Sequence, residues 1–149
     1  MPRIDIACVA PVKTGSDYPP PFDAPAAGRV IRDIACAGGA TDWAANHVVL
    51  PPGGWSSQRH WHADEDEIVV ILAGEATLVD DDGRHPMQTG DIAVFPKRDG
   101  NGHHLINDSG ADCVLLALGI PEASLVTYPD IDLLYAPETG NVHRDGTPY

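Results

Sequence analysis

The sequence predicts an all-β protein with one domain, on three observations. Its 149 residues fall within the usual size of a single domain. Hydrophobic residues make up 43% of the chain, and Gly (15 residues) and Pro (14 residues) are both abundant, which is typical of short strands joined by many turns. The sequence also contains no helical heptads and no internal repeat of fixed period. A single β-rich domain follows from these features.

The N-terminal segment, residues 1–27, is expected to form an arm outside the domain. Residues 3–9 alternate weakly in polarity and could form an edge strand. Residues 11–25 are rich in proline, which cannot donate a hydrogen bond to a sheet, so this part is expected to be extended. It could lie over the domain or over a partner subunit, or bind a module that recognises proline-rich segments.

The domain itself is placed at residues 28–127, as a series of short strands. The first strand covers residues 28–35, and a glycine-rich turn follows it. The next strand, over residues 43–50, is interrupted in polarity by Asn46 and His47. The remaining strands are expected at residues 68–72, 75–79, 90–95, 103–107 and 111–120, with an Asp-Gly hairpin signal at residues 82–83.

The C-terminal tail, residues 128–149, contains several Pro and Gly breaks and has a tyrosine at each end. We expect it to be extended and to pack on the domain or across a dimer. The arm and the tail together favour a homodimer.

The composition of the chain limits its partners and its compartment. The formal charge is −13, from 22 acidic and 9 basic residues, so the surface would repel nucleic acids and anionic membranes. The apolar runs are too short for a membrane-spanning helix, and the apolar stretch at the N-terminus is too short for a signal peptide. We therefore expect a cytoplasmic protein. Cys8, Cys36 and Cys113 form no C-x-x-C pair and are expected to be buried structural thiols.

The main chemical signal is a cluster of possible metal ligands. His60 and His62 are two residues apart, so in a strand their imidazoles point to the same face. A polar turn follows, and Glu67 begins the returning apolar strand, from which its carboxylate can reach the two histidines. An unpaired carboxylate beside an apolar lining would be costly, and a metal is its natural partner. Imidazole and carboxylate together suit Zn, Fe, Mn, Ni or Cu.

This spacing resembles a known family. The stretch from Gly54 to Gly74 has the pattern G-x5-H-x-H-x4-E-x6-G, which matches the first motif of the cupin family at every signature position. The second cupin motif, G-x5-P-x-G-x2-H-x3-N, is matched with a lengthened turn, since two extra residues precede its second glycine and Arg98 stands where the pattern has Gly. The matching residues are Gly90, Pro96, Gly100, His103 and Asn107.

The resemblance implies a double-stranded β-helix, the jelly-roll barrel of cupins, with one divalent transition metal (Fe, Mn, Ni or Zn) inside it. The implied ligands are His60, His62, Glu67 and His103, which leave two open positions on an octahedral metal. Motif spacing favours His103 as the fourth ligand, and His104 is the alternative. Strand alternation puts these two histidines on opposite faces.

Three residues are candidates for contact with a substrate: Gln58, Arg59 and His104. Gln58 shares a face with the two motif histidines under strict alternation. Arg59 is the only cation inside the first motif. It would point outward under the same alternation, or inward toward a substrate carboxylate or phosphate if a bulge turns it.

The resemblance favours a metal-dependent enzyme that acts on a small molecule, of oxygenase (dioxygenase-like), decarboxylase or lyase type. One alternative is a sensor that binds a small molecule or a sugar without turnover. Another is a sugar-phosphate isomerase, although Lys and Arg are scarce near the motifs. A storage role fits less well, because storage cupins tend to lack the histidines. Whether the chain is an enzyme stays open at this point, since the fold alone does not decide function.

Overall fold

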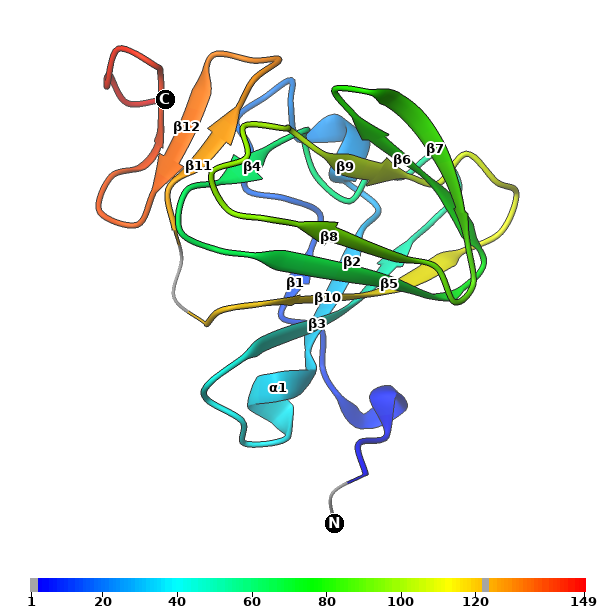
Figure 1. Ribbon diagram of the computed structural model, residues 1–149. Coiled ribbons are helices and arrows are strands. Elements are labelled where there is room, and N and C mark those ends of the chain that lie inside the picture. Colours follow the sequence, from blue (N-terminus) through cyan, green and yellow to red (C-terminus); the bar gives the residue numbers. More distant parts are fainter. Residues whose placement is uncertain (1–2, 122–123) are drawn as a thin grey trace.

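The computed structural model describes residues 3–121 and 124–149, so residues 1–2 of the expected arm and 122–123 of the expected domain lie outside the described part. The described chain is almost entirely β-structure (Figure 1), which confirms the predicted all-β class. The strands are β1 (Lys13–Thr14), β2 (Val30–Asp33), β3 (Ala44–Leu50), β4 (Trp61–His62), β5 (Glu67–Ala73), β6 (Glu75–Asp80), β7 (Gly83–Gln88), β8 (Ile92–Phe95), β9 (His104–Ile106), β10 (Cys113–Gly119), β11 (Val126–Tyr128), β12 (Leu133–Ala136) and β13 (Gly140–Val142). Helical structure is limited to α1 (Ile34–Ala37) and two 3-10 turns, η1 (Ile6–Cys8) and η2 (Ala24–Ala26).

The largest sheet has the order β1-β2-β3-β10-β5-β8, and all of its neighbouring strands are antiparallel. β10 lies at its centre, where Leu115 pairs with Val48 on one side and with Ile71 on the other. These three side chains are at most 5% exposed. They point to the same face of the sheet because residues directly opposite one another on neighbouring strands share a face.

A second sheet, β7-β6-β9, packs on the inner face of the first (Figure 1). Leu105 on β9 and Met87 on β7 are buried against Leu50 and Ile71 of the larger sheet. One continuous apolar core therefore lies between the two layers, as expected for the two-layered jelly-roll barrel. The buried members of this core are Val48, Leu50, Val69, Ile71, Ala76, Met87, Phe95, Leu105, Cys113 and Leu115.

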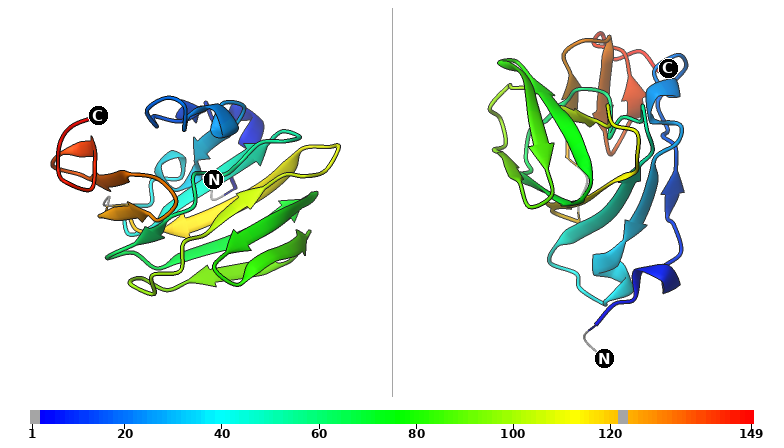
Figure 2. Two further views of the ribbon diagram at one scale, coloured as in Figure 1. Left: turned by 90° about the horizontal axis from the view of Figure 1, so that it is seen from above. Right: turned by 90° about the vertical axis from the view of Figure 1, so that its right-hand side faces the viewer.

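The C-terminal tail is extended and lies against the domain, in agreement with the expectation, but it also forms strand pairs that the sequence did not predict. It forms antiparallel pairs in a small sheet of order β13-β12-β11-β4, seen at one end of the molecule in Figures 1 and 2. β11 pairs with β4, so the tail lies directly against the first motif. Strands of three or four residues, interrupted by Pro and Gly, carry too little periodicity to be predicted.

The N-terminal segment also differs from its prediction. Residues 3–9 contain the turn η1 and not an edge strand, whereas β1, inside the proline-rich segment, pairs with β2. The strand expected at residues 28–35 ends at Asp33, whose carboxylate accepts a hydrogen bond from the amide of Cys36 at 2.9 Å. This N-cap starts α1.

The cysteine prediction is correct only for Cys113, which is fully buried, because Cys8 and Cys36 are exposed. Within the described ranges, no helix has both the length and the apolar character needed to cross a membrane.

Candidate metal centre

Four of the predicted site residues meet at one end of the barrel. His60 and His62 come from the approach to β4 and from β4 itself, and Glu67 begins β5. His103, just before β9, forms an isolated bridge with His60, whose amide donates to the His103 carbonyl at 3.1 Å while the reverse bond is 2.9 Å. The two sequence motifs are thus joined by backbone pairing at the ligand positions themselves.

The possible ligand atoms lie close together. Nε2 of His60 is 3.1 Å from Nε2 of His62, and Nε2 of His103 is 2.9 Å from Oε2 of Glu67. The same carboxylate oxygen lies 3.8 Å from Nε2 of His62. His60, His62 and Glu67 each offer one ligand atom, and these three atoms all lie within 4.8 Å of one another.

In each of the three histidines, Nδ1 points away from the other ligand atoms and faces a hydrogen-bond acceptor. Nδ1 of His60 lies 2.9 Å from the Gln58 carbonyl, and Nδ1 of His62 lies 3.3 Å from a carboxylate oxygen of Glu65. Nδ1 of His103 faces the Asn101 carbonyl at 3.4 Å. In His60 and His62, donation from Nδ1 leaves a lone pair at Nε2, which is the arrangement that metal-binding histidines use. His103 differs in this structure, because its Nε2 donates to Oε2 of Glu67 at 2.9 Å.

Burial sets the charges in the cluster. It lowers the pKa of His60 to about 3 and also lowers the pKa of His62, so both rings are neutral at pH 7. For Glu67, burial raises the pKa, but the hydrogen bond from His103 and the nearby imidazoles outweigh it, and the net pKa lies below its usual value. His60 and His62 therefore present neutral nitrogens beside the Glu67 carboxylate.

These donors fit a divalent metal. Ligands at neighbouring positions on a metal, with bonds of about 2.1 Å, lie roughly 3 Å apart, and the observed separations are 2.9, 3.1 and 3.8 Å. The combination of imidazole nitrogen and carboxylate oxygen suits Fe, Mn, Ni and Zn alike. His60, His62 and Glu67 could therefore hold one divalent ion, with His103 beside them.

His103 and His104 have different surroundings. His103 stacks on Phe95 with ring centroids 3.5 Å apart and faces Glu67. His104 points to the other side, where its Nδ1 faces the Ser57 carbonyl at 3.0 Å and its ring meets Trp55 edge-on. Geometry thus brings His103, and not His104, to Glu67.

The lengthened turn of the second motif is held against the first. Arg98 has a φ of 63°, a left-handed conformation that glycine adopts more easily, at the position where the cupin pattern has Gly. Its amide donates to the His62 carbonyl at 2.9 Å, and its Nε donates to the Ala63 carbonyl at 2.8 Å. These bonds offset part of the strain and fix the turn beside β4.

The cluster lies at the wall of a cavity of about 280 Å³. One part of the lining is apolar and comes from Ile31, Val48, Val69, Leu105, Leu115 and Ala117. The other part adds polar residues that the sequence analysis did not assign to a site: Tyr18, Arg29, Asn46, Ser56, Ser57 and Glu65. Of these, only Asn46 gave a sequence signal, as a polar residue within an apolar strand.

Glu65 is the acidic neighbour of the cluster. One carboxylate oxygen lies 3.3 Å from Nδ1 of His62, and the other accepts a hydrogen bond from the amide of Ile120 at 3.2 Å. Burial raises the pKa of Glu65 to about 7. Gly119 leaves the space for this carboxylate, because a Cβ at that position would collide with it. Glu65 therefore holds His62 from outside the cluster.

Gln58, a predicted substrate contact, is occupied elsewhere. Its side chain is 8% exposed, and its Nε2 donates to the Phe22 carbonyl at 2.7 Å, which ties the N-terminal arm to the first motif. Neither Gln58 nor His104 is among the described residues that line the cavity. Contact with a substrate by these two residues stays a prediction.

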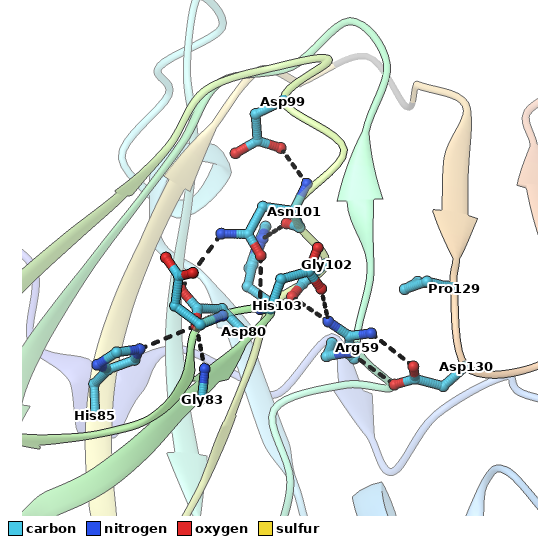
Figure 3. A network of polar contacts seen from close by, with 12 residues as sticks. Arg59, Asp80, Gly83, His85, Asp99, Asn101, Gly102, His103, Pro129 and Asp130 are labelled. Atoms are coloured by element: carbon cyan, nitrogen blue, oxygen red, sulfur yellow. Dashed lines mark hydrogen bonds and ion pairs between the residues drawn. The ribbon is translucent and has the colours of Figure 1, made fainter.

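Arg59 points away from the cavity, as in the outward alternative. It donates to Asp130 from Nε and Nη2 at 2.8 and 2.7 Å, to the Gly102 carbonyl at 3.2 Å, and to Asp81. Figure 3 shows this network continuing through Asn101 and Asp80. Arg59 thus joins the tail to the β6–β7 turn and to the loop before His103.

Replacing Arg59 with alanine is expected to lower the free energy of unfolding by about 2 kcal/mol, because three segments lose a shared, mostly buried cation. The hydrogen bond to Arg59 lowers the pKa of Asp130, so the stabilisation is present above pH 4 and is lost as the pH falls through the folded pKa. Urea unfolding at pH 7 and at acid pH measures both effects. Arg84→Ala is the control, since Arg84 forms one exposed pair with Asp108 and should change stability by less than about 0.5 kcal/mol.

Comparisons with known proteins agree with this geometry. A family model described as a cupin domain matches residues 46–119. The crystal structure of a sugar phosphate isomerase from a cupin superfamily, from Silicibacter pomeroyi, is 35% identical, covers 99% of this chain and 96% of that chain, and has a TM-score of 0.92. A predicted oxalate decarboxylase from Thermotoga maritima is 26% identical, covers 62% of this chain and 79% of that chain, and has a TM-score of 0.53.

A curated relative shares only part of its length. The endoribonuclease YbeY of Myxococcus xanthus is 30% identical over 69 residues, which are 46% of this chain and 23% of that protein. The chain thus spans about a quarter of that relative. The match along nearly the whole length of the Silicibacter pomeroyi protein, together with the domain match, decides the family. The chain belongs to the cupin superfamily.

Proposed function

We propose that this chain is a metal-dependent enzyme that acts on a small molecule, of oxygenase, decarboxylase or lyase type. One observation carries the proposal: His60, His62 and Glu67 place their ligand atoms within 4.8 Å of one another, with His103 beside Glu67, at the wall of a cavity that has room for a ligand. A purely structural metal site would be closed by its protein ligands. The open cavity beside this cluster instead suits a site that binds a second molecule.

In this proposal His60, His62, Glu67 and His103 hold one divalent ion of Fe, Mn, Ni or Zn. The bound ion would supply Lewis acidity toward an oxygen atom of the substrate. The residues of the chain prepare the site: Glu65 orients His62, Phe95 fixes the plane of His103, and the apolar lining restricts water around the substrate.

A sugar-phosphate isomerase is the second candidate. The protein named as one is 35% identical to this chain and matches it over nearly the full length of both. Both candidates use the same ligand cluster, so they differ in the substrate and not in the metal site. The cytoplasmic location and the homodimer stay predictions.

The first test is the metal content of wild-type protein purified without chelator and without a histidine tag. We expect about one equivalent of a transition metal per chain by elemental analysis. Iron leads next to oxygen-uptake assays, and zinc, manganese or nickel leads to isomerase, lyase and decarboxylase assays. Protein that contains no metal and takes none up on addition contradicts the proposal.

A further inference from the structure

The cavity contains a cation that comes from outside both motifs. Arg29, immediately before β2, is the only Lys or Arg among the described residues that line the cavity. In the sequence, the scarcity of Lys and Arg near the motifs disfavoured a sugar phosphate as substrate. The antiparallel pairing of β2 with β3 removes that objection, because it brings Arg29 to the same cavity as the histidines.

Arg29 is fixed by neutral partners. Its Nε and Nη2 donate to the Gly15 carbonyl at 3.2 and 2.9 Å, and its Nη1 donates to the Ser56 carbonyl. These contacts use three of the five N–H groups of the guanidinium, and two have no hydrogen-bond partner in the described chain. The side chain is thus held in place without having its charge neutralised.

This arrangement contrasts with that of three other arginines. Arg59, Arg84 and Arg98 each pair with an aspartate, in a chain that has 22 acidic residues. The guanidinium groups of Arg32 and Arg144 also donate only to backbone carbonyls, but neither residue lines the cavity. Arg29 forms no salt bridge with any described residue. Burial lowers its pKa, yet arginine remains charged at neutral pH. A partly buried, fixed and uncompensated cation at a cavity is suited to bind an anion.

Two further polar side chains line the same cavity. Asn46 on β3 lines the cavity, and its carboxamide has no hydrogen-bond partner among the described residues. Tyr18 comes from the N-terminal arm and packs edge-on to Tyr128, with ring centroids 5.4 Å apart. A carboxamide and a phenol can both donate hydrogen bonds to an oxyanion.

The sheet sets the separation between the two ends of the cavity. β2 and β5 are separated by β3 and β10. The register also places Arg29 and Glu67 toward opposite ends of these strands, because Val30 aligns through Val49 and Val114 with Ala73, at the far end of β5 from Glu67. Both side chains nevertheless line one cavity. The cavity of about 280 Å³ lies at the lower end of the range for ligand-binding pockets, so the ligand is small.

We propose that Arg29, with Asn46 and Tyr18, forms an oxyanion-binding subsite, and that the substrate is a small acid carrying a carboxylate or a phosphate. The inference rests on the proposed function, because it assigns the substrate class of the same cavity. The oxyanion end lies at Arg29 and the reacting end at the histidine cluster.

The test is calorimetric binding of two matched pairs of probes: glycerol 3-phosphate against glycerol, and glycolate against glycolamide. Wild-type protein of measured metal content should bind the anionic member of at least one pair at least tenfold more tightly, and the pair that does so identifies phosphate or carboxylate. Arg29→Gln should weaken anion binding about 10- to 100-fold, because charge-assisted hydrogen bonds are lost. Asn46→Leu should weaken it several-fold.

Two controls separate this inference from the proposed function. Arg84→Gln removes a surface cation and should leave binding unchanged. In His62→Ala, which lacks a metal ligand, the preference for the anionic probe should persist, whereas a preference created only by the metal would disappear and overturn the inference. Metal-free wild type that still prefers the anion would support the subsite and contradict the metal enzyme.

The inference is also overturned if folded Arg29→Gln binds the anions as wild type does, or if wild type binds both members of each pair equally. If Arg29→Gln fails to fold, because it loses the contacts to Gly15 and Ser56, Asn46→Leu decides the question. The side chain of Asn46 makes no such contacts, so the unfolding midpoint of the Asn46→Leu variant should match that of wild type. Unchanged anion binding in Asn46→Leu would then count against the subsite.

Discussion

Replacing His62 with alanine is expected to remove at least nine-tenths of the bound metal while the barrel stays folded. Nε2 of His62 is 3.1 Å from Nε2 of His60 and 3.8 Å from the Glu67 carboxylate, so its loss opens one side of the ligand cluster. Loss of a residue that merely supports a ligand costs about 10- to 100-fold in metal affinity, and loss of a ligand itself should cost at least as much. The His62 side chain is 15% exposed and lies at the cavity wall, so truncation leaves no closed void in the core.

Elemental analysis of wild-type and His62→Ala protein, purified side by side, measures this effect. His85→Ala is the matched control, because His85 is a surface histidine that contacts Asp80 and lies outside the cluster. Circular dichroism confirms that both variants are folded. Full metal occupancy in folded His62→Ala would show that the ligand set is wrong.

The motif residues were predictable because short-range geometry determines them. The period of two in a strand places His60 and His62 on one face, and the same alternation separates His103 from His104. The position of Glu67 at the start of an apolar strand is likewise a local property. The structure brings the ligand atoms of His60, His62 and Glu67 within 4.8 Å of one another and places His103 beside Glu67.

The rest of the cavity was not predictable, because it depends on pairing between distant segments. Arg29 reaches the cavity through the pairing of β2 with β3, and Tyr18 reaches it through the folding back of the arm. Glu65 was expected only as part of a polar turn, yet its carboxylate accepts a hydrogen bond from the amide of Ile120. No sequence pattern within the first motif indicates that the amide of Ile120 contacts Glu65.

Local capping and short strands account for the errors in the fold. Asp33 ends the strand that apolar periodicity extended to residue 35, because its carboxylate caps α1. The pairing of β11 with β4 is a long-range contact between very short strands, and such contacts leave almost no trace in the hydrophobic pattern.

Replacing Asn107 with alanine is expected to cause the largest loss of stability, about 4 kcal/mol. Asn107 is fully buried, and its Nδ2 donates to the Leu50 and Ala111 carbonyls at 2.8 Å each. Its Oδ1 accepts from the amide and the hydroxyl of Ser109 at 3.0 and 2.7 Å. Alanine leaves these groups without a partner and also creates a void, which together should lower the melting temperature by roughly 8–16 °C.

Thermal unfolding of Asn107→Ala and Asn107→Asp, with Asn101→Ala as control, tests this expectation. Aspartate keeps the shape but replaces the donor by an acceptor facing two carbonyls, so it should destabilise at least as much as alanine. Asn101 caps a turn at the surface and should cost about 1 kcal/mol.

The test also separates two roles for a motif residue. Asn107 matches a signature position of the second cupin motif, yet it is not among the described residues that line the cavity. Its backbone pairs with Gly53 and Gly54, so it joins the two motifs through the turn that opens the first. Metal content per folded chain should therefore stay at the wild-type level in Asn107→Ala, in contrast to His62→Ala. A variant with normal stability and little metal would instead place Asn107 in the metal site.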